Sequence, residues 1–187
     1  MTNRTAIFRL STLLLASTLA LPRAAAEPAA RVVREPHFTY LEEPTSEAKE
    51  IIEWAADRYL EAGLQLPDLA VSFPTFCYGR AALYHVGERS IEFCQITRRN
   101  ALHEFAHAWD DTSGAVDREA FLKLRGLTVW FGDLDVPSRE QGCEHLANII
   151  AWGLSDVDTR GVPDLPANSV SQLTEAFTAL TGTAPRS

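Results

Sequence analysis

Apolar residues recur at the three- and four-residue spacing of an α-helix in five stretches of the chain. The first stretch begins at Ser46 and stops before Gly63, a residue type that commonly follows a helix C-terminus. The second follows Thr97, whose side chain can cap a helix running from Arg98 to about Trp109. Both stretches are predicted to be helices.

Three further helices are predicted in the C-terminal half of the chain. Asp117 can cap one that runs to about Gly126. Residues 138–141, Ser-Arg-Glu-Gln, form a capping-box pattern ahead of apolar positions at helical spacing. The last helix is expected over residues 170–180, before Gly182.

Strand-like patterns lie between the first two predicted helices. Residues 69–73 alternate between buried-type and polar positions, and Pro74 ends the run. Residues 81–86 and 90–96 are two more strand-like runs around Gly87, which predicts a hairpin. These strands are expected to form a small antiparallel sheet, so the predicted fold class is α+β.

The N-terminal 26 residues have the pattern of a secretory signal peptide. Arg4 and Arg9 precede an apolar run over residues 10–21, and small residues follow at 24–26. The alternative is a membrane anchor, but the run has about 12 residues where about 20 are needed to span a bilayer. We expect cleavage after Ala26, a secreted or periplasmic protein and no stable membrane anchor. The predicted organisation has three parts: a signal peptide over residues 1–26, an extended segment over 27–44 and one folded domain over 45–187.

Composition and charge narrow the class of protein. The 187 residues are 46% hydrophobic and 22% charged, which suits a folded core and not a disordered tail. Lysine and arginine number 17 against 25 aspartates and glutamates, giving a formal net charge of -8. An acidic chain lacks the basic surface that binding to nucleic acid or to an anionic membrane requires. We therefore expect no nucleic-acid partner.

The chain has three cysteines. Cys77 and Cys94 flank the predicted hairpin, so they are expected to form a disulfide in an oxidising compartment. The alternative is two independent buried thiols. Cys143 is left over and is interpreted as a buried structural thiol.

The second predicted helix contains the motif His-Glu-x-x-His at residues 103–107. Because four residues turn a helix by about 400°, His103 and His107 lie on one face and can bind one zinc ion. Glu104 on the same helix can accept a proton from a water molecule at that ion. The motif predicts zinc-assisted hydrolysis with Glu104 as general base and acid.

A catalytic zinc site needs a third protein ligand. Glu144 is favoured because it lies in the first turns of a separate helix, and Asn148 follows one turn later. The Asn148 carbonyl could accept the other ring proton of His103 and so orient that ligand. The remaining candidates for the third ligand are Asp110, Asp111, Asp117, Glu119 and Glu140. Asp110 and Asp111 are more simply interpreted as residues that terminate the active helix.

The pairing of His103-Glu104-x-x-His107 with the run 144–151, Glu-His-Leu-Ala-Asn-Ile-Ile-Ala, resembles the gluzincin metallopeptidases. It is also similar to minimal gluzincins and to peptidase domains of the ImmA/IrrE type. The resemblance implies a zincin-like fold, in which a sheet packs on the active-site helix and a glutamate-bearing helix, with Glu144 as the third ligand. Many gluzincins carry Asp where this chain has Asn148.

The resemblance also implies how a substrate would bind. The strand at about residues 89–93 would be the edge along which an extended peptide pairs. A further donor would stabilise the oxyanion beside the metal. The candidates for that donor, none of them supported by a motif, are His145, Tyr84, His85 and Arg160.

The sequence thus predicts a secreted zinc metallopeptidase that acts on a peptide or protein substrate. The rivals are a zinc amidase acting on cell-wall peptides and a non-catalytic protein with a structural zinc ion. The acidic balance favours basic or neutral substrates. No oligomeric state follows from the sequence.

Overall fold

The computed structural model describes residues 34–77, 79–132, 136–156 and 168–186, which belong to the unit Arg31–Ser187. The predicted signal peptide and the first part of the 27–44 segment lie outside the described residues. In the part of the chain that is described, no helix combines the length and apolar character needed to cross a membrane.

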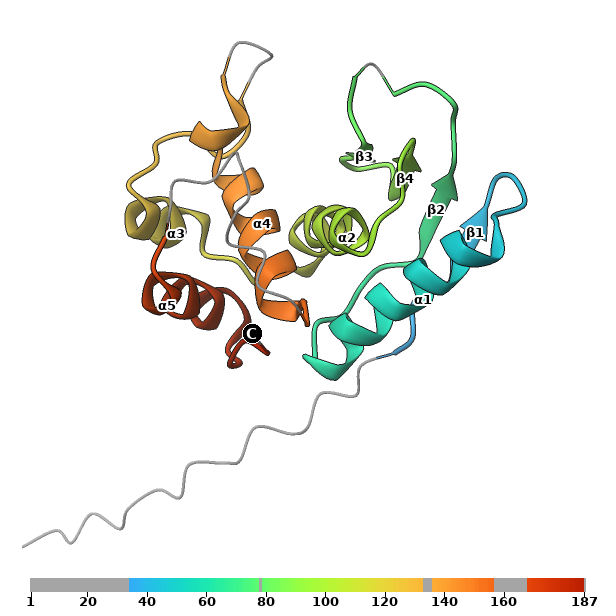
Figure 1. Cartoon of the computed structure of the whole chain (residues 1–187). Coiled ribbons are helices and arrows are strands. Elements are labelled where there is room, and N and C mark those ends of the chain that lie inside the picture. Colours follow the sequence, from blue (N-terminus) through green and yellow to red (C-terminus); the bar gives the residue numbers. More distant parts are fainter. Residues whose placement is uncertain (1–33, 78, 133–135, 157–167, 187) are drawn as a thin grey trace, which may run out of the picture. The chain divides into compact units, whose positions relative to one another are not determined.

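The fold is α+β, as predicted, and its sheet has four strands in the order β1-β2-β4-β3 (Figure 1). The strands are β1 (Phe38–Tyr40), β2 (Leu69–Ser72), β3 (Ala82–His85) and β4 (Ser90–Phe93). Only the predicted hairpin, β3 with β4, is antiparallel; β2 runs parallel to both β1 and β4. The prediction of a small antiparallel sheet was therefore wrong for the sheet as a whole, which is mixed.

The connections explain the mixed sheet. The helix α1 (Ser46–Glu61) carries the chain back between β1 and β2, so these strands point the same way. After β2 the chain passes to the outer strand β3 first and returns through β4, which lies beside β2. The expected edge strand at residues 89–93 is consequently wrong, because β4 is internal and the edge strands are β1 and β3.

Side-chain caps begin several of the helices. Thr45, Thr97 and Asp117 accept hydrogen bonds from backbone N–H groups at the start of α1, α2 (Arg98–Ser113) and α3 (Arg118–Arg125). The helix α2 runs a turn beyond the predicted end, to Gly114 at φ 59°. Asp110 and Asp111 therefore lie within the helix and do not terminate it.

The predicted capping box at residues 138–141 does not form. Those residues make a short 3-10 helix, η1 (Ser138–Glu140), and α4 (Gly142–Leu154) begins with no side-chain cap. Its first N–H groups are satisfied at long range instead, because Gly142 donates to the Val129 carbonyl at 2.8 Å and Cys143 to the Trp130 carbonyl at 3.1 Å. A capping box occurs at the start of α5 (Val170–Thr181).

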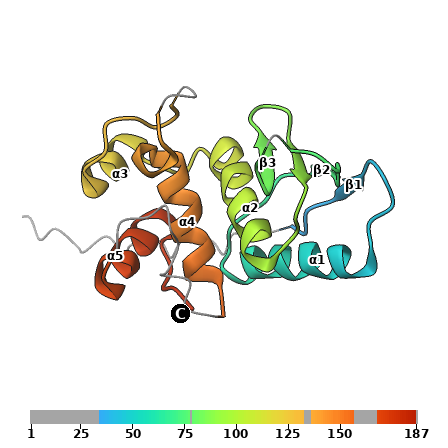
Figure 2. The same cartoon turned by 45° about the horizontal axis from the view of Figure 1, so that its top comes forward.

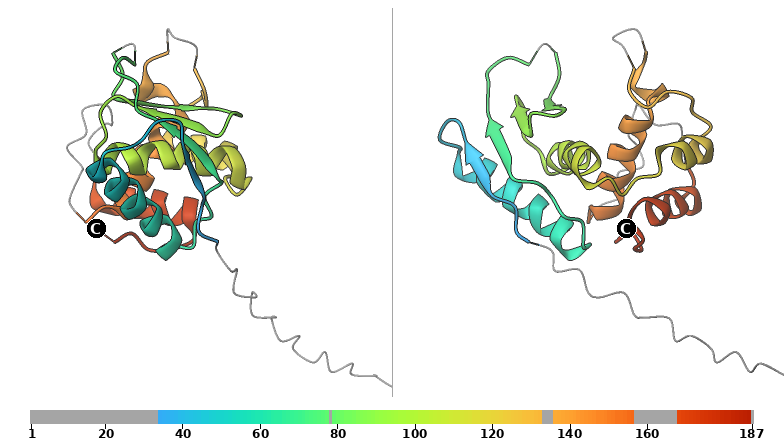
Figure 3. Two further views of the ribbon diagram at one scale, coloured as in Figure 1. Left: turned by 90° about the vertical axis from the view of Figure 1, so that its right-hand side faces the viewer. Right: turned by 180° about the vertical axis from the view of Figure 1, so that it is seen from behind.

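The helix α2 holds the centre of the fold, in contact with α1, β3 and α4, while α3 and α5 pack on α4 (Figure 2). Figure 3 shows α1 and α2 on the same face of the sheet. The sheet's burial pattern agrees, since alternate residues of β2, β3 and β4 are buried. Phe105 of α2 stacks on Phe38 of β1 at 5.6 Å between ring centroids and meets Tyr59 of α1 edge-on. This core fixes α2 against the sheet.

The disulfide between Cys77 and Cys94 is confirmed, with the two Cα atoms 5.9 Å apart. It ties the β2–β3 connection to the residue that follows β4. Disulfides of this kind are typical of proteins outside the reducing cytosol, so the bond supports a non-cytoplasmic compartment. Cys143 is free and buried, as expected.

Candidate metal centre

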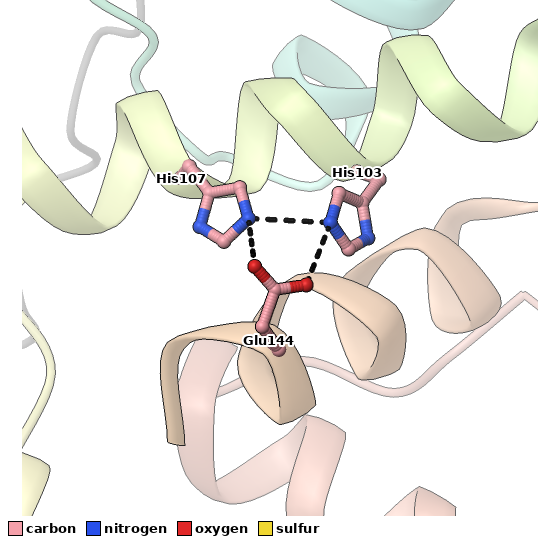
Figure 4. Close-up of side chains that lie close together, drawn as sticks. All are labelled: His103, His107 and Glu144. Carbon is pink, nitrogen blue, oxygen red and sulfur yellow. Dashed lines mark hydrogen bonds and ion pairs between the residues drawn. The ribbon is translucent and has the colours of Figure 1, made fainter. Parts of the chain in front are cut away.

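His103, His107 and Glu144 converge between α2 and α4 (Figure 4). The two histidines project from one face of α2 across one helical turn, and Glu144 projects from the first turn of α4 toward them. The two Nε2 atoms are 3.2 Å apart. Glu144 Oε2 lies 3.3 Å from His103 Nε2, and Glu144 Oε1 lies 3.6 Å from His107 Nε2. The three predicted ligands thus converge and form a candidate metal-binding group, hereafter the metal-binding group.

The spacing of these donors fits a metal ion. Ligands at about 2.0–2.1 Å from a tetrahedral zinc ion are separated from one another by about 3.3–3.4 Å. The two imidazole nitrogens are 3.2 Å apart, and each lies within 3.6 Å of a different oxygen of the Glu144 carboxylate. One ligand atom from each residue lies within 4.8 Å of the other two. The group could therefore hold a metal ion and leave a fourth position for water or substrate.

Small residues let the two helices approach. Ala106 of α2 and Ala147 of α4 are fully buried at 0% exposure, and Ala151 is 2% exposed. A second contact lies one turn away from the metal-binding group: Arg99 Nη2 donates to Asn148 Oδ1 at 2.8 Å. Arg99 precedes His103 by four residues, and Asn148 follows Glu144 by four. The Arg99–Asn148 contact therefore lies one turn along both helices from the His103–Glu144 contact.

Asn148 has different partners from those expected. Its Oδ1 accepts from Arg99, and its Nδ2 donates to the Glu144 carbonyl at 2.8 Å. Arg99 thus occupies the acceptor that the sequence analysis assigned to the His103 ring. Asn148 holds the backbone of the glutamate helix and the Arg99 side chain, not the histidine.

Glu104 lies beside the metal-binding group and lines the same cavity. Its side chain is buried, with the residue 7% exposed, and its Oε2 accepts the Tyr84 backbone N–H at 2.9 Å. Burial raises the pKa of Glu104, although the positive charge of His103 opposes the shift. The edge strand β3 therefore holds one carboxylate oxygen of Glu104 and leaves Oε1 for other chemistry.

The three converging side chains perturb one another. Burial lowers the pKa of His107 to about 4, and the nearby His103 adds to that shift. For His103 burial acts in the same direction, but the hydrogen bond with Glu144 and the charges of Glu104 and Glu144 raise its pKa. Burial would raise the pKa of Glu144, yet the two histidines hold it down at about 2. The group therefore offers an ionised carboxylate and a neutral His107, as metal ligation requires.

A cavity of about 640 Å³ adjoins the metal-binding group. Its walls are the edge strand β3 on one side and the segment before α4 on the other. Two arginines, Arg80 and Arg99, line it together with Glu104 and Glu144. The positive charge of Arg80 lowers the pKa of both glutamates. Neither arginine belongs to a motif that the sequence displays. The remaining lining residues are Ala81, Ala82, Leu83, Tyr84, Val86, Asn100, His103, His107, Phe131, Gly132, Val136, Pro137, Ser138, Gln141, Cys143 and Asn148.

The two aspartates considered as third ligands hold other parts of the fold. Asp110 Oδ2 accepts from Arg118 at 3.0 Å and from the Trp130 indole at 3.3 Å. Asp111 Oδ2 accepts the Tyr84 hydroxyl at 2.7 Å and the Gly87 N–H at 2.9 Å. Asp111 thus fastens the β3–β4 hairpin to α2.

The other candidate ligands also lie outside the group. Asp117 caps α3, and Glu119 and Glu140 are exposed. Cys143 lines the cavity, but burial raises the pKa of its thiol to about 12, so it stays protonated. Its Sγ lies 3.8 Å from Gln141 Oε1. Among the candidate ligands named from the sequence, Glu144 is therefore the carboxylate that the fold brings to the two histidines.

Two of the four candidate oxyanion donors are engaged elsewhere, and the Nε2 of a third, His85, has no hydrogen-bond partner among the described residues. His145 is 2% exposed, and its Nε2 lies 2.8 Å from the Arg139 carbonyl. The Tyr84 hydroxyl donates to Asp111, and His85 lies 3.4 Å from Glu92. Arg160 lies outside the described residues. None of the three is directed at the metal-binding group.

Comparisons with protein-family models, with curated proteins and with solved structures found no match. The functional interpretation of the site therefore depends on its own geometry and chemistry.

Proposed function

We propose that this chain is a secreted zinc metallopeptidase that hydrolyses peptide bonds with a metal-activated water. The observation that supports this most strongly is the triangle of His103, His107 and Glu144 beside an open cavity, with Glu104 on the same helix. Two histidines and one glutamate are a donor set of catalytic zinc sites, which keep one position open. A structural zinc site is normally closed by four protein ligands, so the non-catalytic alternative is less well supported.

Glu104 is the proposed general base and acid. When bound, a zinc ion lowers the pKa of a water molecule toward 7 and polarises a carbonyl group. Glu104 Oε1 accepts the proton of the attacking water and then donates it to the leaving amine. Burial favours this role because it brings the pKa of the carboxyl closer to neutral. The Tyr84 N–H keeps the carboxylate in place through Oε2.

The exposed edge of β3 is the proposed docking line for an extended peptide. Backbone N–H and C=O groups of successive residues in a strand point to alternate sides. The Ala81 carbonyl accepts from Gln95, on the β4 side, so the backbone groups of Ala82 and Tyr84 point away from β4. The Tyr84 N–H is bonded to Glu104. The N–H and C=O of Ala82 are then the groups that a substrate backbone can pair with, next to the metal-binding group.

The test is a digest of a peptide library by the zinc-loaded protein, with the zinc content of each sample measured. We expect the wild type to cleave peptides, and Glu104→Gln to retain zinc while turnover falls about 10²- to 10⁴-fold. Glu140→Gln is the matched control, because Glu140 is exposed and its side chain, within the described ranges, pairs with Arg139 alone, at 3.7 Å. Failure of the wild type to cleave any peptide, or full activity of Glu104→Gln, would refute the proposal.

A further inference from the structure

The charged residues around the cavity differ in balance from the rest of the chain. The whole sequence has a formal net charge of -8, but the cavity is lined by two arginines and two glutamates. Neither aspartate nor lysine is found among the described residues that line it. Among the described residues that line the cavity these two pairs of charges cancel, so a divalent ion at the metal-binding group would add two positive charges to that balance.

Arg80 is positioned at this cavity by the disulfide. Its backbone N–H donates to the Cys77 carbonyl at 2.9 Å, closing a turn in which Gly79 has φ 81°. Cys77 is bonded to Cys94, so the turn is fastened to the end of β4. The Arg80 side chain is exposed and has no hydrogen bond or ion pair with any described residue, in contrast to Arg99, which donates to Asn148. Arg80 therefore presents to the cavity a guanidinium that makes no hydrogen bond to the described part of the chain, although its charge acts on Glu104 and Glu144.

The position of Arg80 along the sheet edge limits where a ligand would meet it. Arg80 precedes Ala82 by two residues, which is about 7 Å at the rise of an extended chain. A peptide paired with Ala82 would thus have a group one or two residues from the cleaved bond within reach of the Arg80 side chain. A guanidinium recognises a carboxylate through charge-assisted hydrogen bonds.

We propose that the cleft selects peptides with a carboxylate within about two residues of the cleaved bond, bound by Arg80, with Arg99 supplying a second positive charge. The inference rests on the proposed peptidase function. It reverses the preference for basic or neutral substrates expected from net charge, because local charge at the cleft, not the total, acts on a bound peptide. The carboxylate belongs either to an acidic side chain or to a free C-terminus.

The experiment uses a peptide cleaved in the library digest, synthesised with Glu, Gln or Lys at the positions flanking the cleaved bond. Each peptide is made with a free and with an amidated C-terminus. We expect the wild type to prefer a carboxylate-bearing peptide by about tenfold in kcat/KM over its neutral match. The amidated series shows whether the favoured carboxylate is the side chain or the C-terminus.

Arg80→Gln should remove this preference, and Arg80→Glu should shift it toward the Lys peptide. Arg98→Gln is the matched control, because Arg98 lies over the Trp54 ring at 4.9 Å and does not line the cavity. Zinc content and circular dichroism establish that each variant is folded. Equal cleavage of Glu, Gln and Lys peptides by an active wild type would overturn this inference alone. A wild type inactive on every peptide would overturn the proposed function and this inference with it.

Discussion

Removing the Cys77–Cys94 bond is expected to destabilise the fold substantially. The two cysteines are 17 residues apart in sequence, and the loop they close contains all of β3 and β4. On the chain-entropy model, closing a loop of this length lowers the free energy of the folded state relative to the unfolded chain by about 3 kcal/mol. For a domain of this size that corresponds to a fall in Tm of about 6–12 °C.

The assay is urea unfolding of the wild type and of Cys77→Ala/Cys94→Ala, each with and without dithiothreitol. We expect the reductant to destabilise the wild type to the level of the double variant and to leave the variant itself unchanged. Cys143→Ala is the matched control: it removes a buried thiol that forms no bridge, so it should cost about 1 kcal/mol or less and keep the response to reductant.

Unfolding of fully reduced wild type at the same urea concentration as the oxidised protein would refute this reasoning. That result would mean that the unfolded chain keeps residual structure between the two cysteines. The disulfide would then remove little conformational entropy from the unfolded state. A thiol titration on each sample shows whether reduction is complete.

Three further outcomes are expected. Asp111→Ala should lower the free energy of unfolding by about 2 kcal/mol, because the Tyr84 hydroxyl loses its acceptor. Asp111→Asn should lower it less, and a urea titration in which both variants match the wild type would contradict this prediction. Gly153→Ala would place a Cβ 2.1 Å from the buried Phe177 ring and should cost about 1–3 kcal/mol in thermal unfolding, and an unchanged Tm would contradict the packing. Zinc affinity should fall as pH is lowered from about 8 to about 5, because Glu144 raises the pKa of His103 and a proton on that ring competes with the metal. A zinc affinity that calorimetric titration finds independent of pH would contradict this prediction.

Local signals predicted the helices well. Thr97 and Asp117 cap the helices that the sequence assigned to them, and Gly126 ends α3 as expected. These features depend on hydrogen bonds within a few residues of one another, so they can be read from short patterns. The start of α4 could not be predicted in this way, because its N–H groups bond to Val129 and Trp130, which are distant in sequence.

The sheet was harder to predict for a related reason. The strand β1 has three residues, Phe38–Tyr40, which is too short to show alternation. Its pairing with β2 depends on α1 crossing between them. Without β1, the strand-like runs at residues 69–73, 81–86 and 90–96 suggested an antiparallel sheet, and the family resemblance implied the wrong edge strand. Strand order is a property of tertiary packing that periodicity does not contain.

The metal-binding group could be predicted from sequence because helical geometry links its members. His103 and His107 are one turn apart, and Glu144 begins a second helix with small residues at the contact. The contact between Arg99 and Asn148 could also have been predicted from the sequence. Arg99 lies four residues before His103 and Asn148 four residues after Glu144, so the two lie one helical turn from the metal-binding group. The position of Arg80 could not be predicted, because a turn and a disulfide bring it to the cavity.

The measurement that tests the central claim most directly is X-ray absorption at the zinc edge of the zinc-loaded protein. The account predicts one zinc ion per chain, with two imidazole nitrogens and oxygen ligands at about 2.0–2.2 Å. Glu144→Ala should alter the oxygen ligands and leave both imidazoles. A sulfur ligand at about 2.3 Å, a shell without imidazole or the absence of stoichiometric zinc would contradict the claim that His103, His107 and Glu144 form the metal site.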